Sequence, residues 1–291
     1  MITCKCKVCG GEMELSGTSG FVCQYCGSKS FFTDADYREN EEFRKKLLLH
    51  YKAEAKNKEF DYGADKLFSF SGRDSFLMAD GQSLNVDYMK KYAYDGMTCY
   101  LTKEFVVYIF DRETDIDAFR NGLDRLTFPA ADDRLHRSFP ELKLEIPLRS
   151  DRYALVFRRR PNLYPAEMFA PMDSVHLAWV ISRMENICCA LAFSGIEHGD
   201  INSTSVWINP VTHEGALFGD WRYVRDIRRT NDLYALRKTA IRIAKNTREP
   251  KELYTFLNSM PQADAFADFE RWERVINEGF GGHHFVKMNI Q

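Results

Sequence analysis

The N-terminus carries two Cys-x-x-Cys-Gly segments, and they constrain its fold more than any other feature of the sequence. The first segment contains Cys6 and Cys9, and the second contains Cys23 and Cys26. Each segment presents two thiolates from one tight turn, and two such turns supply the tetrahedral sulfur site that Zn²⁺ prefers. The spacing therefore predicts that residues 1–32 form a small β-hairpin module closed by zinc.

Cysteine usage along the chain favours a metal site over disulfides. Five of the eight cysteines lie in the first 26 residues, and Cys4 is the spare one of this cluster. Cys4 is an alternative to Cys6 as a ligand, although Cys6 has the better spacing. The site residues are Cys6, Cys9, Cys23 and Cys26, and the module is a zinc ribbon. A closed four-cysteine site is structural, so we expect a folding and docking module.

Length and composition limit the classes of protein to consider. The chain has 291 residues and 45% hydrophobic residues, which is sufficient for one large domain in addition to the ribbon. Its net charge is −2, and the ribbon has no basic excess, so we do not expect a nucleic-acid partner. No run approaches the roughly 18 apolar residues that span a bilayer, and the first residues lack an apolar signal core. We expect a cytoplasmic protein without membrane contact.

Hydrophobic periodicity divides the rest of the chain into three parts. Residues 33–62 are polar with helical spacing and predict a linker helix. Residues 63–160 are strand-rich and contain one predicted helix at 115–126; the main strand candidates are 86–89, 97–101, 105–110, 142–146 and 153–157. Residues 161–291 are mostly helical, with predicted helices at 173–194, 231–245, 250–259 and 263–278. The pattern predicts an α+β fold with a small β-rich N-lobe and a helical C-lobe.

Three short motifs follow one another in the helical half. His198-Gly199-Asp200-Ile201-Asn202 follows the longest helix, Gly219-Asp220-Trp221 comes next, and Asn231-Asp232-Leu233-Tyr234-Ala235-Leu236 opens a further helix. This order resembles the catalytic half of the protein-kinase-like superfamily. It is similar to a group of bacterial kinase-like proteins that share the Asp-Trp form of the second motif and the helix after it.

The resemblance implies a role for each motif residue. Asp200 takes the position of the catalytic base, and Asp220 takes that of the Mg²⁺ ligand against the phosphates of ATP. His198 is expected to pack behind Asp220 and shape the loop. Asp232 is expected to brace the backbone of the catalytic loop.

The sequence departs from the kinase pattern at the groups that bind metal and phosphate. Ser205 stands where a metal-binding asparagine is expected, and a hydroxyl is a poorer ligand. The glycine-rich loop is reduced to Asp95-Gly96, so Gly96 is the remaining candidate for nucleotide contact. Only eleven residues separate Asp220 from Asp232, too few for the segment that seats a peptide substrate.

The lysine and glutamate that grip the nucleotide are also missing. The strand 105–110 places Tyr108 or Ile109 at the lysine position. The following helix places Phe119 or Gly122 at the glutamate position. The absence of both residues is physically consistent, because a buried glutamate without its lysine would lower the stability of the fold.

These departures favour a catalytically impaired kinase-like protein, a pseudokinase, that binds or scaffolds other proteins through the ribbon and the lobes. The alternative is an atypical phosphotransferase that uses Mg·ATP, with Asp200 as base and Asp220 as metal ligand. We expect a protein partner. The basic segments 221–229 and Arg158-Arg159-Arg160 are interpreted as solvated loops.

Overall fold

The computed structural model describes residues 3–5, 9, 12–16, 20–23, 26, 28–31, 65, 67–128, 135–227, 230–246, 248–283, 286 and 288. The chain divides into two units, Met1–Gly63 and Ala64–Gln291. The predicted linker helix and Cys6 lie outside the described residues. Within the part that is described, no helix combines the length and the apolar content that crossing a membrane requires.

The first unit contains a four-stranded antiparallel sheet. Its strands, in spatial order, are β1 (Thr3–Lys5), β2 (Glu12–Ser16), β3 (Gly20–Cys23) and β4 (Lys29–Phe31). Met13 pairs with Cys23 across β2 and β3, and both side chains are buried. This pairing places Cys23, the first cysteine of the second Cys-x-x-Cys-Gly segment, at the end of β3.

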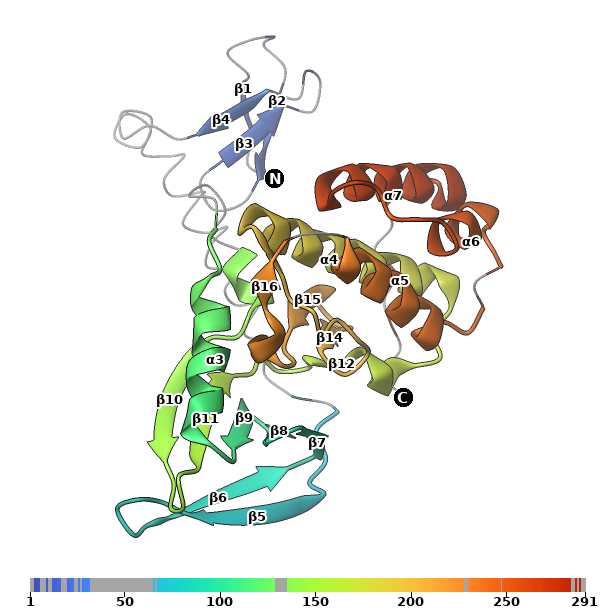
Figure 1. Cartoon of the computed structure of the whole chain (residues 1–291). Coiled ribbons are helices and arrows are strands. Elements are labelled where there is room, and N and C mark those ends of the chain that lie inside the picture. The colour runs from blue at the N-terminus through green and yellow to red at the C-terminus, as the bar shows by residue number, and fades with distance from the viewer. Residues whose placement is uncertain are drawn as a thin grey trace. The chain divides into compact units, whose positions relative to one another are not determined.

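A five-stranded antiparallel sheet forms the first lobe of the second unit (Figure 1). Its spatial order is β10 (Leu142–Pro147), β11 (Tyr153–Arg158), β9 (Phe105–Phe110), β8 (Met97–Leu101) and β7 (Lys90–Tyr94). Helix α3 (Glu113–Asp124) follows β9. A separate hairpin, β5 (Gly72–Leu77) and β6 (Ser83–Tyr88), precedes the sheet in the chain.

The central strand β9 is apolar on both faces because each face packs against a different neighbour. Tyr108 belongs to the main hydrophobic cluster together with Phe119 of α3. Val107 and Ile109 belong to a second cluster with Val86 of the β5–β6 hairpin. The sheet is therefore covered by a helix on one face and by the hairpin on the other.

The arrangement of the first strands differs from the prediction. The predicted strand 86–89 falls on β6, which pairs with β5 in the hairpin rather than with the main sheet. The sheet instead ends in β7, which pairs with β8 and was not predicted. Two of the five residues of β7 are lysines, so the sequence pattern of a strand is weak there. Whether this segment forms a strand depends on tertiary contacts, which hydrophobic periodicity does not reveal.

Four helices dominate the second lobe: α4 (Ser174–Phe193), α5 (Asn231–Ile243), α6 (Lys251–Leu257) and α7 (Ala265–Phe280). Helix α4 packs against both α5 and α7, and most of its residues are buried. Asp173 caps its first turn by accepting a hydrogen bond from His176 N at 2.9 Å. Gly195 follows its end with φ of 70°, a conformation that favours glycine.

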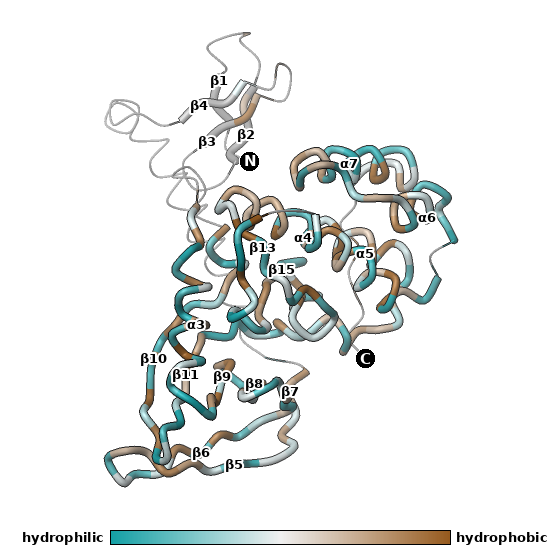
Figure 2. Tube along the Cα trace, in the orientation of Figure 1, coloured by the Kyte–Doolittle hydropathy of each residue, from teal (hydrophilic) through white to brown (hydrophobic). Residues whose placement is uncertain are grey.

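Short strands complete this lobe, and the first two motifs lie in loops between them. They are β12 (Tyr164–Pro165), β13 (Ile196–Glu197), β14 (Val206–Asn209), β15 (Glu214–Leu217) and β16 (Arg225–Asp226). Figure 2 shows hydrophobic and hydrophilic residues alternating along α7, as expected for a helix that covers a core. A β-rich lobe followed by a helical lobe confirms the predicted α+β fold class.

Candidate functional site

The loop between β13 and β14 carries the first motif, and the start of α5 holds its backbone. Asp232 Oδ2 accepts a hydrogen bond from His198 N at 2.7 Å, and Asp232 Oδ1 accepts one from Gly199 N at 3.0 Å. Gly199 has φ of 79°, which allows the backbone to turn both amides toward one carboxylate. The carboxylate thus sets the start of the loop.

His198 is fully buried, and its side chain holds the loop backbone two residues further on. Its Nδ1 accepts a hydrogen bond from Asp200 N at 3.2 Å, and its ring lies edge-on to Trp221 at 4.6 Å. Burial lowers the pKa of His198 to about 3, so the imidazole is neutral at pH 7. Its contacts make it a structural member of the loop.

The Asp200 carboxylate contacts groups of the protein itself. Oδ1 accepts from Asn202 Nδ2 at 2.7 Å, and Oδ2 accepts from Asp220 N at 3.0 Å. Burial raises the pKa of Asp200 to about 6, and the nearby charge of Asp220 acts in the same direction. The first motif is therefore joined to the second by a direct hydrogen bond.

Asp220 is fully buried, and one arginine binds both of its oxygens. Arg222 Nε donates to Oδ1 at 2.9 Å, and Arg222 Nη2 donates to Oδ2 at 2.7 Å. This is the bidentate geometry in which a guanidinium binds a carboxylate most strongly. Arg222 Nη2 also donates to Asp95 O at 2.6 Å, and Nη1 lies 3.4 Å from Asp115 Oδ2 on α3.

Ser205 is used inside the loop. Its hydroxyl accepts from Asn202 N at 2.8 Å and donates to Asn202 O at 3.2 Å. The Asn202 side chain in turn accepts from the amides of Thr204 and Ser205 at 2.8 and 3.1 Å. The end of the catalytic loop is thus closed by its own hydrogen bonds.

Two of the residues that the resemblance gives as candidates for the lysine and glutamate positions are in contact. The rings of Tyr108 and Phe119 face each other, with centroids 5.0 Å apart. The Tyr108 hydroxyl accepts a hydrogen bond from Gly219 N at 3.0 Å. The other two candidates lie elsewhere: Ile109 packs toward the hairpin, and Gly122 lies against Trp221.

Gly96 occupies the turn between β7 and β8 with φ of 68°. A Cβ atom built at this position would lie 3.0 Å from Asp115 Oδ2 and 3.7 Å from Arg222 Nη1. The turn is therefore close to α3 and to Arg222. It does not form an extended glycine-rich lid.

These residues do not fit a magnesium–nucleotide complex. Both oxygens of Asp220 bind Arg222, and the Ser205 hydroxyl is used within the loop. Tyr108, one of the two candidates for the lysine position, carries no positive charge, and its hydroxyl accepts from Gly219 N. The structure brings the predicted residues Asp200, Asp220 and Ser205 together, with their polar atoms bound to other parts of the protein.

The cysteine cluster does fit a metal ion. The sulfur atoms of Cys9, Cys23 and Cys26 all lie within 4.8 Å of one another, and the Cys9 and Cys23 sulfurs are 3.5 Å apart. Four thiolates at about 2.3 Å from zinc give sulfur–sulfur distances close to this. Hydrogen bonds from Ser28 lower the pKa of Cys26 to about 6, which favours the thiolate that zinc requires. The fourth predicted ligand, Cys6, lies outside the described residues.

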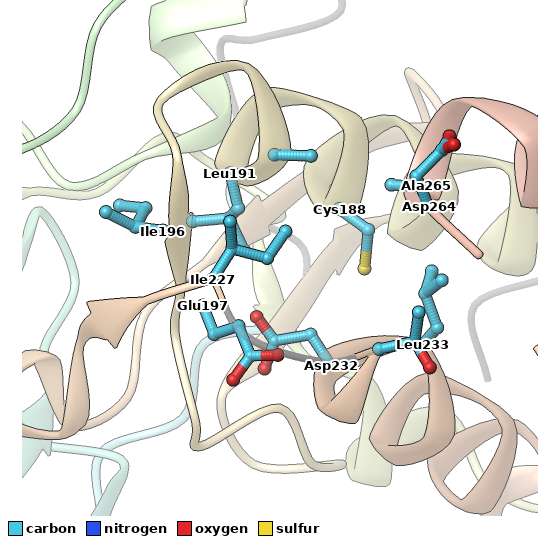
Figure 3. A pocket seen from close by; sticks show the side chains of 11 residues that line it. Cys188, Leu191, Ile196, Glu197, Ile227, Asp232, Leu233, Asp264 and Ala265 are labelled. Carbon is cyan, nitrogen blue, oxygen red and sulfur yellow. The ribbon is translucent and has the colours of Figure 1, made fainter.

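A small cavity lies behind the catalytic loop, between α4 and the start of α5 (Figure 3). Glu197, Asp232 and Cys188 are among its lining side chains, and its volume is about 20 Å³. That is room for about one water molecule. A larger groove of about 280 Å³ lies between α6 and α7. Neither of these two cavities of the described chain is lined by Asp200 or Asp220.

Two arginines differ from the expectation of solvated loops. Arg222 has a side chain only 13% exposed because of its contacts with Asp220 and the N-lobe. Arg159 is also buried: it forms an ion pair with Asp65, donates to Thr102 O at 2.8 Å and lies over the Tyr164 ring. The sequence contains one indication of the contact between Arg222 and Asp220, because Arg222 follows the expected metal ligand by two residues. It contains no comparable indication that Arg159 is buried.

Comparisons with known proteins give a structural likeness only. No protein-family profile matches the chain, and no curated protein matches it in sequence. Among solved structures, the bifunctional kinase–methyltransferase WbdD, crystallised with the kinase inhibitor LY294002, is 13% identical with a TM-score of 0.48. That match covers 66% of this chain and 46% of WbdD, so the chain spans about half the length of that protein.

Two kinase domains are similar over more of their length. The ROP18 kinase domain in complex with AMP-PNP and sucrose is 13% identical with a TM-score of 0.46, and the match covers 82% of this chain and 96% of that one. The BubR1 kinase domain is 12% identical with a TM-score of 0.45, covering 78% and 92% respectively.

Proposed function

We propose that this protein is a catalytically impaired kinase-like protein, a pseudokinase, that acts as a binding or scaffolding module with a zinc ribbon as its docking domain. The observation that carries the proposal is the bidentate pair of Arg222 and Asp220. The guanidinium binds both oxygens of the carboxylate that the resemblance assigns to a magnesium ion.

The energetic consequence is large. Phosphoryl transfer depends on metal ions and fixed cations that neutralise the phosphates, so losing that charge lowers the rate by many powers of ten. A magnesium ion would first have to displace Arg222 from a buried carboxylate. Removing one partner of a buried ion pair typically costs about 3–5 kcal/mol, because the other charge is left unpaired, so the loss of Arg222 has to be offset by the incoming ion.

The exchange of an ion pair for an aromatic pair supports the same function. Tyr108 and Phe119 pack together where a kinase needs a lysine and a glutamate. Neither side chain carries a positive charge to the phosphates. Their contact stabilises the lobe without any nucleotide.

A calorimetric titration of Mg·ATP into the purified protein tests this proposal, with D220A as the control. We expect no magnesium-dependent binding at millimolar nucleotide. Binding that requires both Mg²⁺ and Asp220 would instead favour the phosphotransferase, with Asp200 as base and Asp220 as metal ligand. D200A would then have to abolish nucleotide turnover.

The docking role of the ribbon depends on its metal. We expect one zinc ion per chain by elemental analysis, and loss of that zinc in a C23S variant. Because the chain divides into two units, removing zinc with a chelator should unfold the first unit and leave the thermal transition of the second unchanged. A chain without zinc whose first unit remains folded would contradict the zinc ribbon.

The partner we propose is a protein. The net charge of −2 gives no general attraction for a polyanion. Salt-dependent retention of DNA or RNA that is lost in C23S would favour a nucleic-acid adaptor instead.

A further inference from the structure

The edge strand β7 runs along the boundary between the two lobes. Side chains two residues apart on a strand point to the same side, so Lys90, Tyr92 and Tyr94 share one face. Lys90 forms an ion pair with Glu167, which lies on the helical turn Ala166–Phe169 of the second lobe. The Tyr92 hydroxyl donates to the same Glu167 carboxylate at 3.0 Å. The first half of β7 is thus attached to the second lobe.

The second half of the strand reaches the catalytic loop. The Tyr94 side chain lies within interaction distance of Thr204. Burial raises the pKa of Tyr94, and the neighbouring Asp200 and Asp220 carboxylates act in the same direction. Tyr94 therefore lies among the groups that the resemblance assigns to the nucleotide.

The turn between β7 and β8 is joined to the second lobe through Arg222. Arg222 Nη2 donates to Asp95 O at 2.6 Å while the same guanidinium binds Asp220. Its Nη1 lies 3.4 Å from Asp115 on α3. One guanidinium therefore joins the β7–β8 turn, helix α3 and the second lobe.

We propose that β7 is an interlobe clamp: its side chains and Arg222 hold the two lobes closed without nucleotide. The clamp deepens the proposed function and rests on it, because it explains how a kinase-shaped protein keeps a single lobe arrangement when no Mg·ATP bridges its lobes.

The chain contains a matched control for the Lys90–Glu167 part of this clamp. Lys91 lies next to Lys90 but points to the other face of the strand. It forms an ion pair with Asp74 of β5 at 2.7 Å, entirely within the first lobe. The two lysines are similarly exposed, at 45% and 46% of their side chains. K91A therefore removes a comparable ion pair without touching the boundary between the lobes.

Hydrogen exchange measured by mass spectrometry, without nucleotide, tests the clamp. The informative variant combines E167A with D220N and R222Q. Replacing Asp220 together with Arg222 avoids a buried unpaired carboxylate, which would itself unfold the protein. We expect amide exchange in segments 92–98 and 198–206 to rise about tenfold or more in this variant. K91A should exchange like the wild type in both segments.

Two results would overturn the clamp. One is a folded triple variant, verified by circular dichroism, that exchanges like K91A in both segments. The other is wild-type protein in which segment 92–98 exchanges at the rate of an unprotected chain. Both results are obtained with nucleotide-free protein. The proposed function is contradicted by a different result, Mg·ATP binding that depends on Asp220. The two failures are therefore distinguishable.

Discussion

Helix α3 approaches the Asp220 segment so closely that only glycine fits at position 122. A Cβ atom built on Gly122 would lie 2.1 Å from the Trp221 carbonyl oxygen and 3.3 Å from Val224 Cγ2. Non-bonded heavy atoms prefer roughly 3.5 Å or more, so G122A must move the helix or the turn by about 1 Å. The obstacle is backbone, which cannot rotate away as a side chain does.

The expected effect of G122A is a balance of two terms. Alanine is favoured over glycine in a helix interior by about 1 kcal/mol, which would stabilise the variant. Forcing extra volume into a packed contact typically costs about 1–3 kcal/mol, and a backbone obstacle places this site at the upper end. We therefore expect the free energy of unfolding of G122A to fall by about 2 kcal/mol.

Urea denaturation followed by tryptophan fluorescence measures this change. The control is N121A, at the exposed neighbouring position on the same helix, where only the helix propensity acts. N121A should be as stable as the wild type or slightly more stable. If G122A were also as stable as the wild type, the close packing of α3 on Trp221 would be wrong.

Two further predictions concern buried groups of the second unit. Burial raises the pKa of Glu185 on α4 to about 9, and the charge of Asp268 adds to the effect. The folded protein then keeps a proton that the unfolded chain loses above about pH 4.5, so stability falls as pH rises from about 5 to 9, by about 1.4 kcal/mol per pH unit. E185Q should remove this slope, and equal free energies of unfolding for the wild type in urea denaturation at pH 6 and at pH 8 would contradict the assignment. Y108F removes the acceptor for Gly219 N and should lower the free energy of unfolding by about 1–3 kcal/mol, since a buried donor is left unpaired. If Y108F were as stable as the wild type in thermal and urea unfolding, the hydroxyl would not contribute to stability.

The helices of the second lobe were predictable because their signals are local. The prediction of a helix at 173–194 needed only a capping residue, Asp173 or Ser174, a long apolar run and Gly195. The structure has α4 at Ser174–Phe193 with Asp173 as its cap. The order of the three motifs was likewise visible in the sequence, since each motif is a short run of residues.

The first strands of the sheet were not predictable in the same way. β7 is short, contains two lysines and pairs on one edge only, so its pattern is weak. Its tyrosines alternate, yet alternation alone does not say whether a strand joins the main sheet or a hairpin. The place of β7 in the main sheet depends on its pairing with β8 and on its contact with Glu167, which is distant in sequence.

The sequence by itself determined the cysteine spacing, the two-lobed order of elements and the positions of Asp200, Asp220 and Asp232, because spacing and periodicity are properties of neighbouring residues. Only the tertiary structure decided what those groups bind. Arg222 reads as a solvated residue in a basic loop, but the fold buries it against Asp220 and beside Asp115. The reason is electrostatic: whether a charge is solvated or neutralised depends on which distant carboxylates and carbonyls the folded chain brings within a few ångströms of it.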